Sequence, residues 1–269
     1  MTYRIARAIA PPVLAAALGA GLSACDRDAR AKGSPDAAGD PLSSLIASAR
    51  PVPTTAGSPA LREPTTSHIA PPTPDDSDSA CPSDMARVYA YCIDRYEAPN
   101  VAGEWPLVME SAVSAAGWCE KRGKRLCEEA EWERACAGPQ GFKYPYGDAH
   151  EEARCADEKE WISKDESTIV MWPEKPAMGE VTRLYQATKS GSRDGCVTGY
   201  GVHDMTGNVE EWVRGDPKSH HGYEHVLKGC YWSGCYGGSK PSCGSTNAAH
   251  ADAFKFYETG FRCCKDARR

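Results

Sequence analysis

The chain has 269 residues, a quarter of them charged, and its formal net charge at pH 7 is −6 with histidine neutral. This excess of acid makes nucleic acid and anionic lipid headgroups poor partners for the folded part as a whole. There are thirteen cysteines, and the twelve between Cys81 and Cys264 predict an exported domain held together by disulfides.

Residues 1–24 have the pattern of a secretory signal peptide. Arg4 and Arg7 precede an apolar run that contains no acidic residue and ends in the sequence LSAC at Cys25. The run is too short and wrongly flanked for a stable membrane span. Because LSAC resembles the bacterial lipobox, we expect Cys25 to be acylated and to hold the protein at a membrane of a bacterial cell envelope. The alternative is an ordinary signal peptide cut at a small-residue site.

Residues 25–83 are rich in Pro, Ala, Ser, Thr and Asp, and have scarcely any large apolar side chain. Such a segment cannot bury enough apolar surface to offset the entropy lost on ordering. We therefore predict a disordered tether with an end-to-end distance on the order of 40 Å, followed by a folded domain over residues 84–269. A proline-rich ligand is the alternative, but the segment lacks a basic PxxP signature.

The domain opens with a β-rich run over residues 88–96, which Pro99 ends. We predict one strand here, closed onto its own N-terminal turn by a Cys81–Cys92 disulfide. A helix is expected over residues 110–122, stopped by Gly123. The core candidates of this helix are Val113, Ala116, Trp118 and Cys119.

A second, short helix is predicted within KRLCEEAEWERACAG, residues 124–138, because its first turn is acidic and Gly138 ends it. Its core candidates are Ala130, Trp132, Ala135 and Cys136. Residues 148–198 read as a long, polar and irregular connection, which Cys155 and Cys196 are available to staple. The expected picture is little regular structure and many disulfides.

The segment GYGVHDMTGNVEEWV, residues 199–213, combines three glycines with several oxygen donors. Calcium takes six to eight oxygen ligands, including backbone carbonyls. If the loop turns back on itself, the carboxylates of Asp204 and Glu211 could join carbonyls of residues 207–209 in one shell. The alternative is an Asx/Gly turn that leads into a strand whose Trp212 enters the core.

The segments KRLCEEAEWERACAG, YPYG, GYGVHDMTGNVEEW, VLKGCYW and TGFRC follow one another between residues 88 and 264. In this order they resemble the sulfatase-modifying-factor domain, typified by the formylglycine-generating enzyme. The family's pattern in the third segment ends in G-N-x-W-E-W, where this chain has GNVEEW. The resemblance implies an α+β domain with a C-type-lectin-like fold, little regular secondary structure, two helices near its start and short twisted strands.

The resemblance also implies disulfides and a metal. Its two family pairings match Cys119 with Cys263 and Cys136 with Cys243, and the remaining cysteines suggest Cys127–Cys264 and Cys155–Cys196 as guesses. The family binds calcium at the G-N-x-W-E-W loop. That site matches Asp204, Gly207, Val209 and Glu211, with side-chain oxygens at the two ends and backbone carbonyls between them.

The family's active site is a C-x4-C pair whose thiolates hold Cu(I), a soft ion, and activate oxygen to convert a substrate cysteine to formylglycine. Cys230 and Cys235 have this spacing. However, Cys230 replaces the second glycine of the family's G-G-S, so in register the active positions fall on Gly234 and Ser239. The alternative is that Cys230 and Cys235 form a structural disulfide or pair elsewhere.

Histidines give little sign of a metal. His220, His221 and His225 cluster in a loop without an acidic array and are expected to be solvated, and the family's HxxxHxE iron motif is absent. No CxxC pair occurs, which argues against structural zinc.

Two functions are therefore weighed. One is a non-catalytic, surface-tethered recognition domain that presents loops 148–198 and 214–226 to a peptide, glycan or protein partner. Its exposed anchors would be Trp161, Trp172, Tyr185 and Tyr223. The other is a copper-dependent oxidase that acts on a cysteine of a sulfatase-like protein through Cys230 and Cys235.

Overall fold

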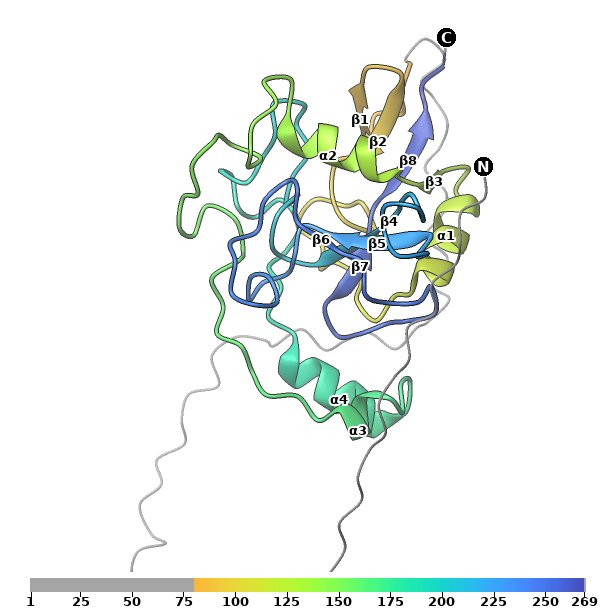
Figure 1. Ribbon diagram of the computed structural model, residues 1–269, viewed down its shortest axis with the longest axis vertical. Coiled ribbons are helices and arrows are strands. Elements are labelled where there is room, and N and C mark those ends of the chain that lie inside the picture. The colour runs from red at the N-terminus through yellow and green to blue at the C-terminus, as the bar shows by residue number, and fades with distance from the viewer. Residues whose placement is uncertain (1–79, 269) are drawn as a thin grey trace, which may run out of the picture. The chain divides into compact units, whose positions relative to one another are not determined.

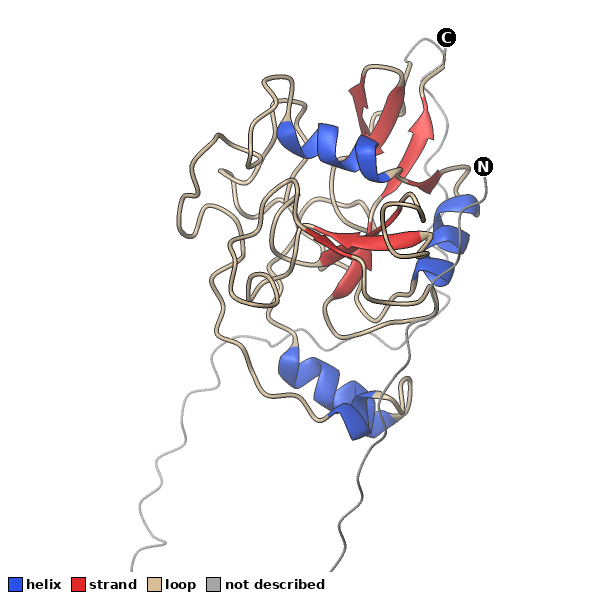
Figure 2. Cartoon of the chain, in the orientation of Figure 1, coloured by secondary structure: helices blue, strands red, loops and turns tan. Residues whose placement is uncertain are grey.

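The computed structural model describes residues 80–268. The predicted signal peptide, the lipidation site at Cys25 and nearly all of the predicted tether lie outside the described residues. The described part has eight strands in two four-stranded sheets, four helices and long loops between them (Figures 1 and 2). This is the α+β class that the sequence predicts. Within residues 80–268, none of the helices has the length and apolar character that crossing a membrane requires.

The first sheet joins the two ends of the domain. Its strands are β1 (Met85–Val88), β2 (Tyr91–Asp94), β8 (Cys263–Asp266) and β3 (Arg125–Leu126), in that spatial order, and all neighbours are antiparallel. The C-terminal strand β8 thus lies inside the sheet, between elements from the start of the domain.

The single strand predicted over residues 88–96 is wrong. The chain turns at Tyr89 and Ala90 into a hairpin of β1 and β2, and Tyr89 is 63% exposed with φ +50°. Tight hairpin turns of this kind usually carry Asn or Gly, and Tyr89 and Ala90 are neither.

The second sheet has the order β6-β5-β4-β7. Its strands are β4 (Glu210–Arg214), β5 (His225–Lys228), β6 (Thr246–Asn247) and β7 (Thr259–Phe261), and only the β4–β7 pair is parallel. Trp212, Leu227 and Phe261 are fully buried in a cluster that includes residues of the helix α1. Trp212 therefore enters the core, and its Nε1 donates to the Glu110 carbonyl at 2.9 Å.

The two predicted helices are present. α1 (Ala112–Glu120) begins at a capping box between Ser111 and Ser114, which satisfies free N–H groups of the first turn. α2 (Glu129–Ala137) ends at Gly138, whose φ of +67° favours glycine. Two core assignments are wrong, because Val113 is 64% exposed and Ala130 is also exposed. The buried faces follow Ala115 and Cys119 in α1, and Trp132 and Cys136 in α2, each pair four residues apart.

The region 148–198 is not irregular throughout, as the sequence had suggested. It contains α3 (Glu166–Ile169) and α4 (Lys175–Leu184), which lie side by side below the two sheets in the view of Figure 1. Ala177, Val181 and Leu184 form the buried side of α4. Their spacing of four and three residues is a helical signal that the many polar residues around them obscure.

All twelve cysteines between Cys81 and Cys264 are paired. The bridges are Cys81–Cys92, Cys119–Cys263, Cys127–Cys264, Cys136–Cys243, Cys155–Cys196 and Cys230–Cys235. These include the predicted Cys81–Cys92 bridge and the two pairings that the family resemblance implies, Cys119–Cys263 and Cys136–Cys243. They also include the two guessed pairs, Cys127–Cys264 and Cys155–Cys196. Consecutive residues of a strand face opposite sides, so Cys263 ties β8 to α1 while Cys264 ties it to Cys127, ahead of α2.

Candidate functional site

The predicted calcium loop, residues 204–211, is a tight backbone turn. Asp204, Gly207 and Asn208 all have φ between +56° and +75°. A Cβ on Gly207 would lie 2.3 Å from the Ala156 carbonyl oxygen, so only glycine fits there. The Asn208 side chain accepts from the Thr188 N–H at 2.7 Å and donates to Glu97 Oε1 at 2.7 Å. These bonds hold the loop in one conformation.

Glu211 is bound by a buried arginine. Arg262 donates from Nε to Glu211 Oε2 at 2.7 Å and from Nη2 to Glu211 Oε1 at 2.6 Å, and both side chains are almost fully buried. Trp132 Nε1 also donates to Glu211 Oε2, at 2.8 Å. The negative charge that the loop was expected to offer a cation is therefore already neutralised within the chain.

Asp204 and Glu97 are buried acids beside this pair. Asp204 Oδ2 accepts from the Gly191 N–H at 2.6 Å, whereas Oδ1 has no hydrogen-bond partner among the described residues. Glu97 accepts from Ser190 Oγ at 2.6 Å. Burial raises the pKa of both carboxyl groups, and the charge of Asp204 raises the pKa of Glu97 further.

In this conformation the side chains do not form the predicted calcium shell. Of the two side-chain ligands, Asp204 offers one free oxygen, but both oxygens of Glu211 are engaged by Arg262. Within residues 80–268, no group of three or more His, Cys, Asp or Glu side chains is arranged to hold a metal ion. Calcium at Asp204, Gly207, Val209 and Glu211 stays a prediction.

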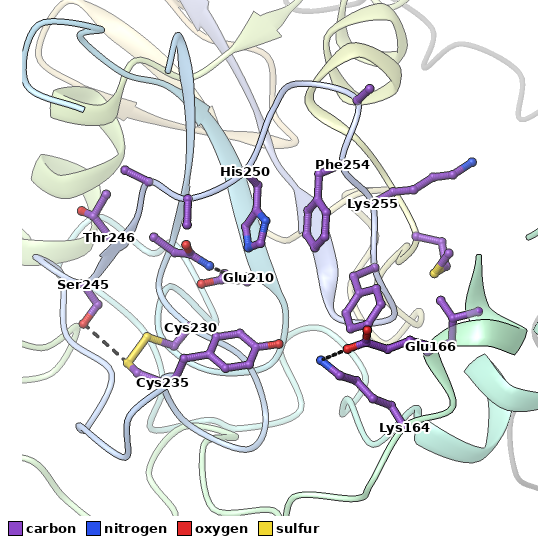
Figure 3. A pocket seen from close by; sticks show the side chains of 18 of the residues that line it. Lys164, Glu166, Glu210, Cys230, Cys235, Ser245, Thr246, His250, Phe254 and Lys255 are labelled. Atoms are coloured by element: carbon purple, nitrogen blue, oxygen red, sulfur yellow. Dashed lines mark hydrogen bonds and ion pairs between the residues drawn. A yellow bond between two sulfur atoms is a disulfide. The ribbon is translucent and has the colours of Figure 1, made fainter. Parts of the chain in front are cut away.

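The second candidate feature is the pair Cys230 and Cys235. The two sulfurs form a disulfide that lies in the wall of a pocket of about 1020 Å³ (Figure 3). Cys230 is 6% exposed, Cys235 is half-buried, and Cys235 Sγ lies 3.8 Å from Ser245 Oγ. The positions that match the family's copper ligands, Gly234 and Ser239, carry no thiol. The oxidised pair therefore presents no thiolate to a copper ion.

Comparison with known proteins decides the family. The profile of the "Sulfatase-modifying factor enzyme 1-like domain" matches residues 80–267. The chain belongs to the sulfatase-modifying-factor family. Its fold is accordingly of the formylglycine-generating-enzyme type, as the ordered motifs of the sequence predict.

Relatives of the chain within and around this family are distant. The bovine protein named "Inactive C-alpha-formylglycine-generating enzyme 2" is 27% identical over 175 residues, which are 62% of this chain and 52% of that protein. The Chlamydia pneumoniae protein named "Serine/threonine-protein kinase pkn1" is 27% identical over 184 residues, which are 60% of this chain and 24% of the kinase. The chain thus spans about half, or less, of these relatives.

Two solved structures are also similar. A crystal structure of CarF is 16% identical with a TM-score of 0.45, and it covers 66% of this chain and 87% of its own. PvdO from Pseudomonas aeruginosa is 18% identical with a TM-score of 0.42, and it covers 65% of this chain and 80% of its own.

Sequence reasoning missed one acidic residue of the pocket. Glu210 and Glu211 are consecutive in β4, so their side chains point to opposite sides. Glu211 reaches Arg262, while Glu210 lines the same pocket as the disulfide. The signal was available, because Glu210 stands where the sulfatase-modifying-factor pattern has the first tryptophan of W-E-W.

The expected aromatic anchors are mostly not exposed. Trp161 is 57% exposed, but Trp172, Tyr185 and Tyr223 are partly buried. Tyr185 packs against Trp105 and Trp232, and its hydroxyl donates to the Pro106 carbonyl at 2.9 Å. Of the four, only Trp161 is exposed, while Trp172 lines the pocket.

The expectation that the loop histidines are solvated is also wrong for two of them. His220 Nε2 lies 2.6 Å from Glu129 Oε2, and His225 Nδ1 lies 3.0 Å from Asp252 Oδ1. His221 is exposed and lines the pocket.

Proposed function

We propose that this sulfatase-modifying-factor domain is a non-catalytic recognition domain of an exported protein, held at a bacterial envelope membrane by a lipid on Cys25. Its ligand would be a peptide, a glycan or a protein partner. The observation that carries the proposal is the Cys230–Cys235 disulfide, together with Gly234 and Ser239 at the positions where the family has its copper-binding cysteines.

The chemistry of copper supports this conclusion. Cu(I) selects soft thiolate ligands, and the family's oxidase needs two of them at once. Without a thiolate pair at the matching positions, oxygen activation has no metal centre to occur on. The similarity to a bovine protein that is itself named inactive agrees with a member of this family that has lost the reaction.

The surface around the pocket supports recognition. Three apolar side chains are exposed between residues 161 and 171, namely Trp161, Val170 and Met171, and Val170 lines the pocket. A concave site with an apolar, exposed rim is the usual form of a ligand-binding surface.

A second function is favoured by one observation. The disulfide is part of the pocket wall and Cys235 is half-buried, so a reductant could reach it. A reduced pair would hold copper and make the domain a formylglycine-generating oxidase, which uses oxygen to convert a substrate cysteine to an aldehyde.

An aldehyde assay separates the two. The purified domain, with and without mild reduction, is incubated with copper, oxygen and a cysteine peptide of the sulfatase type, and any aldehyde is captured by a hydrazide probe. We expect no aldehyde above the level of the Cys230→Ser/Cys235→Ser double variant. Copper-dependent aldehyde formation that the double variant lacks would replace recognition by catalysis as the function.

A further inference from the structure

The pocket contains a carboxylate that nothing in the described chain neutralises. Glu210 is 3% exposed, and its side chain makes one long hydrogen bond, from Asn247 Nδ2 to Oε2 at 3.4 Å. Figure 3 shows this carboxylate directed into the pocket, between His250 and the Cys230–Cys235 disulfide. No lysine, arginine or histidine of residues 80–268 forms an ion pair with it.

A second buried carboxylate lies beside the first. The Glu210 N–H donates to the Glu258 carbonyl at 2.9 Å, so the two residues are backbone neighbours where β4 and β7 begin. Glu258 is 1% exposed. Its Oε1 accepts from the pocket residue Tyr236 at 2.5 Å, while its Oε2 has no partner among the described residues. Burial and the charge of Glu258 raise the pKa of Glu210 to about 8, so without a nearby cation the protonated acid is favoured at pH 7, and a cation bound beside it favours the carboxylate.

Two other buried acids of the domain do have cations, whereas Glu97 and Asp204 beside the predicted calcium loop, like Glu210, form no ion pair among residues 80–268. Asp94 lies 2.6 Å from Lys124, and Glu211 lies 2.6 Å from Arg262. Burying a carboxylate without a cationic partner is unfavourable. The fold therefore holds two acids at the pocket at a cost to its own stability, which is typical of a binding site.

The walls of the pocket suit an ammonium or guanidinium group with an apolar stem. Phe254, Phe256 and Trp172 line it. At one end Lys164 already occupies such an environment, because its Nζ lies 4.6 Å from the ring centre of Phe256 and 3.2 Å from Glu166. Figure 3 shows Lys255 directed away from the pocket centre, and Lys164 is paired with Glu166, so neither lysine of the pocket wall forms an ion pair with Glu210.

We propose that this pocket binds a basic side chain, lysine or arginine, presented by a partner polypeptide. Glu210 supplies the opposite charge, the aromatic walls contact the aliphatic stem, and the exposed Val170 in the pocket wall contacts the neighbouring residues of the partner. The net charge of −6 favours the approach of a basic partner. The inference rests on the proposed recognition function and names its ligand class.

The test compares charged and neutral ligands of one shape. Alanine-rich hexapeptides with one central arginine, lysine, citrulline or norleucine are titrated into the disulfide-intact domain by calorimetry at pH 7. We expect the arginine and lysine peptides to bind at least tenfold more tightly than their neutral counterparts. The acetylated amides of single arginine and lysine should bind at least tenfold more weakly than the peptides, because they lack the rim contacts.

Variants connect the binding to the pocket. Glu210→Gln keeps the shape of the side chain and should weaken binding of the arginine peptide at least tenfold, while the exposed Glu224→Gln should leave it unchanged. Ala249→Trp places a bulky group at an exposed position of the pocket wall and should abolish binding, even if Glu210→Gln fails the circular dichroism test for folding.

Several results would overturn the inference. They are equal binding of the citrulline or norleucine peptide, undiminished binding by a folded Glu210→Gln variant, and no binding of any basic peptide at millimolar concentration. Equal affinity for the peptide and the single amide would assign the pocket to small amines rather than to a polypeptide. The proposed non-catalytic function is tested separately, by the aldehyde assay, so the failure of this inference is distinct from the failure of that function.

Discussion

At the scale of single residues, Arg262 is the side chain on which the buried polar groups converge. Its guanidinium binds both oxygens of Glu211 and donates to the carbonyls of Asp94 at 3.3 Å and His203 at 2.9 Å. It thereby connects β2, β4 and the loop before β4 from the junction of β7 and β8. An arginine fits this position because its planar group offers five donors in fixed directions.

Replacing Arg262 with methionine should destabilise the domain by about 3–5 kcal/mol, because Glu211 is left buried and uncompensated. Urea unfolding of the disulfide-intact protein measures the loss. Arg214→Met is the matched control. Arg214 pairs with Glu128 at the surface, where side-chain exposures are 63% and 35%, and such pairs contribute about 0–1 kcal/mol. An equal loss of unfolding free energy in the two variants would contradict a larger contribution of Arg262 to stability.

The ion pair between Arg262 and Glu211 also affects the predicted binding of calcium. Since Arg262 occupies both oxygens of Glu211, we expect the melting temperature to be the same in calcium and in a calcium chelator. Differential scanning calorimetry measures this directly. A fall of several degrees in the chelator would show that Glu211 exchanges arginine for the cation, as the family resemblance implies.

Glu258 should make stability depend on pH. Burial raises the pKa of its carboxyl group to about 7, above the 4.5 expected for the unfolded chain. Between these values the folded state binds more protons than the unfolded state, so stability is fully present below about pH 4.5 and is lost as the pH rises to about 7. Each unit of pKa difference corresponds to about 1.4 kcal/mol.

Glu258→Gln should therefore reduce the loss of stability between pH 5 and pH 7.5, measured by urea unfolding at several pH values. Glu210 contributes a change of the same sign, so some dependence remains. Glu152→Gln, at an exposed position, is the control and should keep the full dependence. A Glu258→Gln variant with an unaltered pH profile would show that Glu258 is ionised in the folded protein throughout this range.

At the scale of elements, the Cys230–Cys235 disulfide, which closes a turn, is the most accessible of the six disulfides. Cys235 is half-buried in the pocket wall, whereas no cysteine of the other five bridges is more than 6% exposed. Because thiol–disulfide exchange needs access to a sulfur, mild reduction should open Cys230–Cys235 first. Alkylation followed by peptide mapping measures the order, and simultaneous labelling of Cys119 or Cys127 would contradict it.

Sequence reasoning succeeded for elements with a local signal. The bounds of α2 were predictable because Gly138 stops the helix and its first turn is acidic, whereas α1 ends at Glu120, two residues before the predicted end. The hairpin of β1 and β2 was not, since its turn residues Tyr89 and Ala90 are not turn formers. α4 was missed because its three buried residues are separated by a charged and polar surface.

The candidate site was predictable only in part. The spacing of Cys230 and Cys235 gave the disulfide as one of two alternatives. Glu97 and Arg262, which surround the predicted calcium loop, come from distant segments, and no local pattern links them to Asp204 or Glu211. Glu210 had a signal, the loss of a family tryptophan, but its buried neighbour Glu258 did not.

At the scale of the whole molecule, the proposed attachment to a membrane rests on residues outside the described part. We expect wild-type protein in a bacterial host to incorporate an alkyne-tagged fatty acid and to remain with the membrane fraction, since the LSAC sequence ends the predicted signal peptide. Cys25→Ser should lose both properties, while Ser34→Ala should keep them. An unlabelled wild-type protein would show that the signal peptide is an ordinary one.

The last strand of the domain has a consequence for how the chain matures. β8 carries Cys263 and Cys264 side by side, one bonded to α1 and the other to Cys127. If the two sulfurs exchange mates, the strand must be turned over, and every side chain along it changes face. An oxidant alone would leave such a mispaired β8 trapped, whereas a disulfide isomerase could rearrange the wrong bridges before the remaining ones form. We therefore expect the yield of correctly folded protein to depend on a disulfide isomerase and not on an oxidant alone.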